Sequence, residues 1–226
     1  MKLINEIKNA KCLVLDKRIE FWPTLKESFQ QRGITVNRFL AGDGHLKDEQ
    51  YDYIDTNDVT PSYYGGTDYA TWYNRPNAFN AWKCHKLMFQ SSLLDGFDHL
   101  LLIEDDAFIE NDFDDILEKT EEFWDIHQYD IIYFGCYPQP NGLQPTTNPY
   151  LFKATKVAGF HAVLLTKPVI EKLLSFFALG PYDEICWKYI NSKVHAWAFN
   201  PCIISQKSGY SFVEGSNLEK PSRLYK

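Results

Sequence analysis

The chain has 226 residues, of which 45% are hydrophobic and 16% aromatic, enough for one sizeable core, so we expect a single domain. A formal net charge of -7 argues against a nucleic-acid partner, because such binding needs surplus lysine and arginine to displace phosphate counterions. The five cysteines are odd in number, scattered and without a CxxC pair, which argues against a disulfide framework or a structural zinc site.

The beginning of the chain predicts a β-α-β unit. Residues 11–16 form an apolar run typical of a strand, residues 19–32 carry apolar side chains at helical spacing, and residues 34–39 predict a second strand. Gly33 is placed to end the helix, and residues 41–44 predict a turn. Such a unit implies a parallel sheet with a ligand crevice at the carboxyl ends of its strands.

Residues 48–76 are rich in Tyr, Asp, Thr, Gly and Pro and show little periodicity. A segment of this length without clear secondary structure is uncommon unless it is functional or disordered, and its aromatic content argues against disorder. Its aromatic rings could stack on a sugar or a base, or pack against the core. Residues 80–94 then predict a helix with apolar side chains on one stripe.

The most informative stretch is an apolar run, residues 100–103, followed by three acids, Glu104, Asp105 and Asp106. The run is short for a helix and too apolar for a loop, so it predicts a strand buried on both faces. Three adjacent carboxylates at its end repel one another unless a cation or water reaches them. They could also be a solvated turn that starts the next element.

The second half of the chain alternates further strands and helices. We expect helices at 113–123, 168–177 and 182–191, and strands at 129–133, 156–165 and 196–200, the second of them with a possible bulge. Residues 138–149 predict a flexible loop, and residues 205–226 a polar, irregular tail. With no repeat and no linker, the pattern predicts one α/β domain with a mixed sheet flanked by helices.

Carboxylates at a strand end can hold Mg²⁺ or Mn²⁺ and leave positions open for phosphate oxygens. A metal bound in this way would neutralise charge on a leaving diphosphate, as the use of a nucleoside-diphosphate sugar requires. The triplet alone is a weak signal for this chemistry. A metal phosphohydrolase is a less favoured alternative, because no His/Asp cluster indicates a two-metal site.

Several stretches together make the signal specific. Residues 101–108, Leu-Leu-Ile-Glu-Asp-Asp-Ala-Phe, resemble the hydrophobic-Glu-Asp-Asp signature of glycosyltransferase family 25, the lipooligosaccharide-type and collagen-type galactosyl- and glucosyltransferases. Further stretches resemble elements of that family in the same order: residues 13–18, 38–44, 84–85 (Cys-His for the usual Ser-His), 158–162, 181–183 (Pro-Tyr-Asp), 200–206 and 209–215. The resemblance covers the chain from about residue 11 to residue 215.

This resemblance implies a GT-A-type Rossmann-like fold and a metal-dependent, inverting transfer of galactose or glucose from a UDP-sugar to a hydroxyl of a glycan acceptor. It divides the single domain, residues 1–226, into a nucleotide-binding half to about residue 110, an acceptor-binding half from about 111 to 215, and a tail at 216–226.

The resemblance also implies roles for single residues. Glu104 and Asp106 would hold Mn²⁺ or Mg²⁺, and Asp105 would face the ribose or the donor sugar. Asp183 would be the general base, with Glu184 as its substitute. The nucleotide and its diphosphate would be bordered by Asp16, Arg18, Arg38, Gly42, Gln206 and Ser211.

Three departures from the family pattern leave donor and acceptor open: Phe79-Asn80-Ala81 lacks the usual helix-opening glycine, His161 replaces a small or aromatic residue, and the 48–76 segment is private to this chain. Asp183 could instead be a helix-dipole acid, and His85, His161, Trp187 and Trp197 could be structural. A catalytically inactive carbohydrate- or nucleotide-sugar-binding module is the alternative function. With no signal peptide and no apolar run of about 20 residues, we expect a soluble, cytoplasmic protein without a transmembrane segment.

Overall fold

The computed structural model describes residues 2–41, 76–176, 181–211 and 216–218. Its centre is an eight-stranded mixed sheet in the order β2-β1-β3-β8-β5-β9-β7-β6. These strands are β1 (Ala10–Leu15), β2 (Val36–Ala41), β3 (His99–Glu104), β5 (Ile131–Pro138), β6 (Leu143–Pro145), β7 (Leu151–Ala154), β8 (Val157–Thr166) and β9 (Ala196–Phe199). The single mixed α/β domain expected from the sequence is confirmed.

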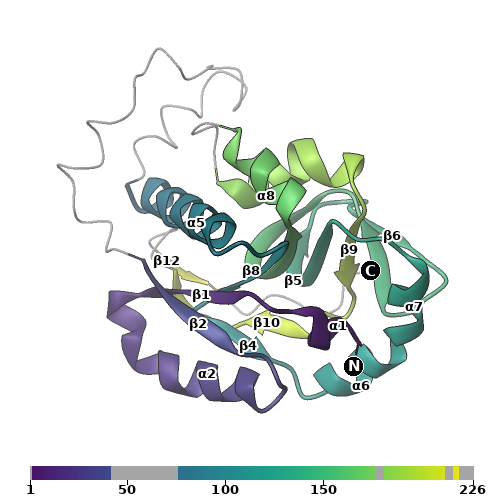
Figure 1. The fold of residues 1–226 in the computed structure, drawn as a ribbon, viewed down its shortest axis with the longest axis horizontal. Helices are drawn as coiled ribbons and strands as arrows, with labels where there is room; N and C mark the ends of the chain where they lie inside the picture. The colour runs from purple at the N-terminus through teal and green to yellow at the C-terminus, as the bar shows by residue number, and fades with distance from the viewer. Residues whose placement is uncertain (1, 42–75, 177–180, 212–215, 219–226) are drawn as a thin grey trace.

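Helices pack on both faces of this sheet (Figure 1). They are α1 (Lys2–Glu6), η1 (Asp16–Phe21), α2 (Trp22–Gln30), α5 (Pro76–Leu94), α6 (Phe113–Lys119), α7 (Glu121–Ile126), α8 (Lys167–Leu174), α9 (Tyr182–Ile185), η2 (Cys186–Ile190) and η3 (Asn191–Lys193). Side chains of α5, α8 and α9 share one buried cluster, and side chains of α2, α6 and α7 share another. The sheet is therefore the middle of three layers.

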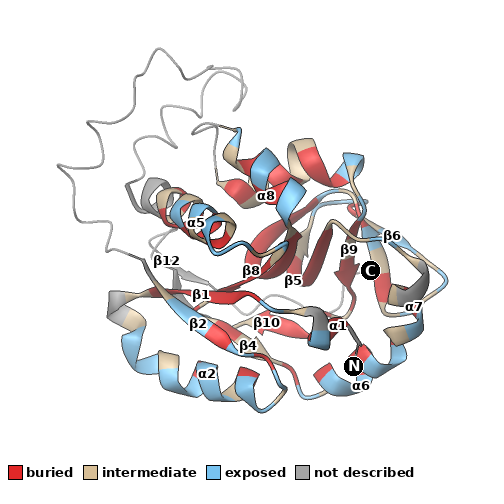
Figure 2. Cartoon of the chain, viewed as in Figure 1, coloured by how far each residue is buried: buried red, intermediate tan, exposed pale blue. Residues whose placement is uncertain are grey.

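Strand β3 shows how the sequence produces this layering. Leu100 and Leu102 belong to the cluster under α5, whereas Leu101 and Ile103 belong to the cluster under α2. All four are fully buried. The labelled strands β8 and β5, which follow β3 in the sheet, are likewise coloured as buried in Figure 2. Successive strand residues point to opposite faces, so a continuous apolar run is what a strand covered on both sides requires. The predicted central strand is confirmed.

The sheet gathers several strand ends at one edge. Strands β2, β1 and β3 are mutually parallel, which confirms the predicted β-α-β unit, and Gly33 ends its helix at a φ of 77°. Strand β8 is antiparallel to both β3 and β5, so β5 runs in the same direction as β3. The carboxyl ends of β1, β3 and β5 thus lie at the same edge, where the acids follow β3.

Three local predictions were wrong. Residues 113–123 form two helices because the chain breaks at Thr120, whose hydroxyl bonds the Leu117 carbonyl at 2.9 Å and competes with the helix. The expected loop at 138–149 contains β6, which pairs with β7. The expected irregular tail contains β10 (Ile204–Gln206), paired with β4 (Ala107–Ile109), and β11 (Gly209–Ser211), paired with β12 (Ser216–Leu218).

The predicted turn after β2 and the aromatic segment at 48–75 lie outside the described residues. Among the helices that the structure does describe, none is long and apolar enough to cross a membrane.

Gly135 marks a point of close packing beside the acidic edge. The register of β5 against β8 shifts on both sides of this residue. A Cβ atom at Gly135 would lie 1.9 Å from the Ile204 carbonyl oxygen and 2.2 Å from His161 Nε2. Because a backbone atom cannot yield as a flexible side chain can, we expect Gly135→Ala to destabilise the fold by about 1–3 kcal/mol or more. Urea unfolding of the variant checks this, and an unchanged midpoint would contradict the packing.

Candidate functional site

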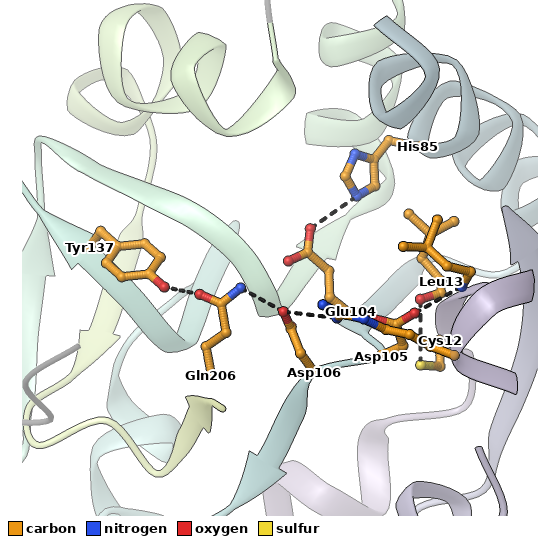
Figure 3. Close-up of polar contacts among 10 residues, drawn as sticks. Cys12, Leu13, His85, Glu104, Asp105, Asp106, Tyr137 and Gln206 are labelled. Carbon is orange, nitrogen blue, oxygen red and sulfur yellow. Dashed lines mark hydrogen bonds and ion pairs between the residues drawn. The ribbon is translucent and has the colours of Figure 1, made fainter. Parts of the chain in front are cut away.

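The three acids lie where β3 ends and the chain turns into β4. Glu104 is the last residue of β3, and Asp105 and Asp106 form the turn (Figure 3). We call these three residues the acidic triplet. Although they are consecutive, their side chains have different partners and different degrees of burial, so each has its own chemistry.

Asp105 is held inside the protein. Its Oδ2 accepts a hydrogen bond from the Leu15 N–H at 2.8 Å, and its Oδ1 accepts one from Arg18 Nη1 at 2.8 Å. Burial raises the pKa of the Asp105 carboxyl, and the Leu15 N–H and the Arg18 guanidinium oppose that rise. Asp105 therefore ties the end of β3 to the start of η1 and positions Arg18. Its contact with the ribose stays a prediction.

Asp106 has one satisfied oxygen and one unsatisfied oxygen. Its Oδ2 accepts a hydrogen bond from Gln206 Nε2 at 2.9 Å and lies 3.2 Å from Arg18 Nη1. Tyr137 in turn donates its hydroxyl proton to Gln206 Oε1, so a chain of contacts runs from β5 through β10 to the triplet (Figure 3). By contrast, Asp106 Oδ1 is buried and has no hydrogen-bond partner among the described residues. A buried carboxylate oxygen of this kind costs free energy unless a ligand satisfies it.

Glu104 faces His85, which comes from α5. His85 Nε2 lies 3.6 Å from Glu104 Oε1, too long for a good hydrogen bond and within reach of an ion pair. Burial raises the pKa of the Glu104 carboxyl, and the charges of Asp106 and Asp105 raise it further, while His85 lowers it. The sequence left open whether His85 lies at the site, and the structure places it beside Glu104 of the triplet.

Asp183 approaches the same neighbourhood from α9. Its Oδ2 accepts a hydrogen bond at 3.2 Å from the N–H of Gly159, whose φ of 95° turns the backbone of β8 there. Burial raises the pKa of Asp183 to about 6, and the charges of Glu104 and Glu184 add to that rise. Glu184 itself points elsewhere and pairs with Lys188 at 2.8 Å. Of the two acids, Asp183 is the one whose environment suits a general base.

Two neighbours of the triplet were not singled out as site residues from the sequence. His161 on β8 is 2% exposed, and burial lowers its pKa to about 4, so the imidazole is neutral at neutral pH. Its ring lies 5.3 Å from that of Tyr137, and its Nδ1 has no partner within the described part of the chain. Burial raises the pKa of Tyr137, aided by the charges of Asp106 and Glu104, which keeps this hydroxyl protonated. The only sequence signal was the place of His161 in the Gly159-Phe160-His161 stretch.

Of the four other predicted nucleotide contacts, three lie on described elements and one lies outside the described residues. Asp16 is the first residue of η1, and Ser211 is the last residue of β11. Arg38 is exposed on β2, opposite Cys12 and three residues before the end of the strand. Gly42 lies outside the described residues. The structure thus brings Arg18 and Gln206 to the triplet, and the roles of the other four stay predictions.

The donor set of the triplet suits a hard cation. Within the described ranges, no group of three or more His, Cys, Asp or Glu side chains is arranged to hold a metal ion. Protein sites for Mg²⁺ at phosphate groups commonly use only one or two carboxylates, the other ligands being water and phosphate oxygens. Glu104 and Asp106 have such oxygens, and Asp106 Oδ1 has no hydrogen-bond partner in the part of the chain that the structure describes. By the type of their donor atoms, these residues fit the ion.

Fold and site together define an α/β protein with a carboxylate site at the carboxyl ends of parallel strands. No protein-family model matches the sequence, and the comparison with curated proteins gave no match. Membership of glycosyltransferase family 25 is therefore not confirmed.

Two solved structures to which the chain is similar are distant from it in sequence. The chain is similar to A197 from STIV, at 12% identity and a TM-score of 0.44, over 96% of this chain and 97% of that one. It is also similar to a glycosyltransferase involved in the glycosylation of the major capsid of PBCV-1, at 11% identity and a TM-score of 0.36, over 80% of this chain and 75% of that one. At these values, the case for a function rests on the side chains of the site.

Proposed function

We propose that this protein is a metal-dependent, inverting glycosyltransferase that moves galactose or glucose from a UDP-sugar to a hydroxyl of a glycan acceptor. The observation that carries the proposal is the buried Oδ1 of Asp106, which has no hydrogen-bond partner among the described residues, although Oδ2 of the same carboxylate accepts a hydrogen bond from Gln206. It supports a ligand that binds at the end of β3.

Glu104 and Asp106 would hold Mn²⁺ or Mg²⁺, which when bound supplies positive charge beside the leaving diphosphate. Arg18 lies 3.2 Å from Asp106 and is held by Asp105, so a second, fixed positive charge borders the same place. Preorganised charges that face a developing anion favour the transition state more than the ground state. Asp105 contributes by holding this guanidinium in position.

Asp183 would accept the proton of the acceptor hydroxyl. The hydroxyl oxygen forms its bond to the anomeric carbon while the bond from that carbon to the diphosphate breaks, and UDP leaves with the electron pair. Attack from the side opposite the diphosphate inverts the configuration. A carboxyl with a pKa of about 6 is mostly ionised at neutral pH, yet is a stronger base than an ordinary aspartate.

Calorimetric titration of the protein with UDP, with and without Mn²⁺, tests the donor site. We expect Mn²⁺ to strengthen UDP binding, and we expect slow hydrolysis of UDP-galactose or UDP-glucose in the absence of acceptor. A panel of UDP- and GDP-sugars then identifies the donor. If UDP fails to bind in either condition, the proposal is wrong.

A catalytically inactive nucleotide-sugar-binding module is a second candidate. It is favoured by contacts within the protein that engage two of the three acids, since Arg18 donates to Asp105 and Gln206 donates to Asp106. Mn²⁺-dependent UDP binding without donor hydrolysis or transfer would support this alternative.

A further inference from the structure

A cavity of about 330 Å³ lies on the acceptor-binding half predicted from the sequence, and no residue of the triplet lines it. Its volume is at the lower end of the range of small-molecule sites, roughly 300–1,000 Å³. Its walls come from the turn between β7 and β8 and from the helical segment η2 with the start of η3. The lining residues are Thr155, Lys156, Trp187, Lys188, Tyr189 and Ser192.

The cavity lies one helical turn from the proposed base. Lys188 pairs with Glu184 at 2.8 Å, which shows that side chains four residues apart in α9 and η2 lie beside each other. Asp183 and Trp187 have the same spacing, a rise of about 6 Å along a helix. The opposite wall is Thr155 and Lys156, just before the stretch of β8 that bonds Asp183. The cavity therefore borders the same helical segment and the same strand that hold Asp183, although Asp183 is not one of its lining residues.

The chemistry of the walls fits a charged sugar. The aromatic face of Trp187 can cover the apolar C–H face of a pyranose ring, and Ser192 offers a hydroxyl to its hydroxyl groups. The Thr155 hydroxyl donates to the Gly142 carbonyl at 3.1 Å and can still accept a hydrogen bond, and Tyr189 stacks on Phe176. Two lysines line this one cavity in a chain whose formal net charge is -7. A lysine ammonium binds carboxylate and phosphate as a point charge.

The position of Lys188 is fixed by its surroundings. Its Nζ lies 5.1 Å from the centre of the Trp187 ring, in addition to its ion pair with Glu184. Glu184, the predicted substitute base, thus positions a cation at the cavity wall. A side chain already held in place loses less entropy when a ligand binds.

We propose that this cavity is an acceptor subsite for a sugar that carries a carboxylate or a phosphate. That the bound sugar is an acceptor rests on the proposed glycosyltransferase function. That the cavity binds an anionic sugar does not depend on that function. The charged group lies toward Lys156 and Lys188, and the ring lies on Trp187, so that a neighbouring hydroxyl of the acceptor faces Asp183.

NMR titration with glucuronic acid, glucose 6-phosphate and glucose tests the subsite. We expect both charged sugars to bind at least about tenfold more tightly than glucose. Lys156→Glu should weaken binding of the charged sugars by at least about tenfold and leave glucose unchanged. The matched control is Lys172→Glu, the same charge reversal at an exposed residue of α8 that does not line the cavity. Lys156 is exposed, so the variant keeps its fold.

Trp187→Ala should weaken the binding of all three sugars, since the contact with the Trp187 ring does not depend on charge. Equal binding of glucose and glucuronic acid, or unchanged affinity in Lys156→Glu, overturns the subsite. Displacement of glucuronic acid by UDP alone would assign the cavity to the donor and overturn it as well. The UDP titration separates the two proposals: charged-sugar binding without Mn²⁺-dependent UDP binding upholds the cavity and refutes the glycosyltransferase.

Discussion

Asp106→Asn is expected to remove the Mn²⁺-dependent part of UDP binding, a loss of at least about tenfold in Kd, or roughly 1.4 kcal/mol. The reason is the unsatisfied Oδ1 of Asp106, which would be a metal ligand. An amide carries no negative charge and is a weaker ligand for a hard cation. Calorimetric titration with UDP at saturating Mn²⁺ measures the effect, and titration without the metal should give the wild-type value.

The Asp106→Asn substitution should change metal binding without disturbing the fold. Asparagine keeps the size of aspartate and an oxygen that can accept from Gln206 Nε2, so the melting temperature should change little. Asp115→Asn is the matched control, because Asp115 is an exposed acid of α6 that pairs with Lys119 at 2.6 Å and does not belong to the triplet. If Asp106→Asn binds UDP with wild-type affinity in Mn²⁺, the triplet is not the metal site.

The parts of the fold that could be predicted are those with a local signal. Residues 100–103 are continuously apolar, and that alone indicates a strand covered on both faces. The short strands β4 and β10 carry no such signal. Each has three residues, and they pair across almost a hundred positions, Ser205 opposite Phe108. Strands this short exist because the tertiary structure brings them together, so no window of sequence reveals them.

The same distinction applies to the candidate site. The acidic triplet and Asp183 stand at the end of a strand and the start of a helix, which sequence patterns can locate. The side chains around them depend on the register of β5 and β8, which shifts around Gly135, and Tyr137 and His161 come from these two strands. The internal role of Asp105 likewise depends on Arg18, 87 residues earlier in the chain. Such pairings require the folded sheet.

Asp183→Asn is expected to reduce transfer by roughly 10²–10⁴, the usual contribution of a general base, while UDP binding in Mn²⁺ stays unchanged. The amide oxygen can still accept from the Gly159 N–H, so the loss should appear in kcat without unfolding. Burial raises the pKa of Asp183 to about 6. The wild-type rate should therefore fall as the pH drops through about 6, since the protonated carboxyl cannot take a proton, and the variant should lack this dependence.

The pH dependence of stability, compared between the wild type and Asp183→Asn, gives an independent check on the raised pKa of the Asp183 carboxyl. A raised folded-state pKa means that Asp183 favours the fold most at low pH, when it is protonated, and that this contribution is lost as the pH rises through about 6. Asparagine stays neutral, so Asp183→Asn should be at least as stable as the wild type at pH 8. Glu184→Gln is the control variant, because Glu184 is the neighbouring acid and pairs with Lys188, whereas Asp183 bonds Gly159. Wild-type turnover in Asp183→Asn with a large loss in Glu184→Gln would reassign the base to Glu184.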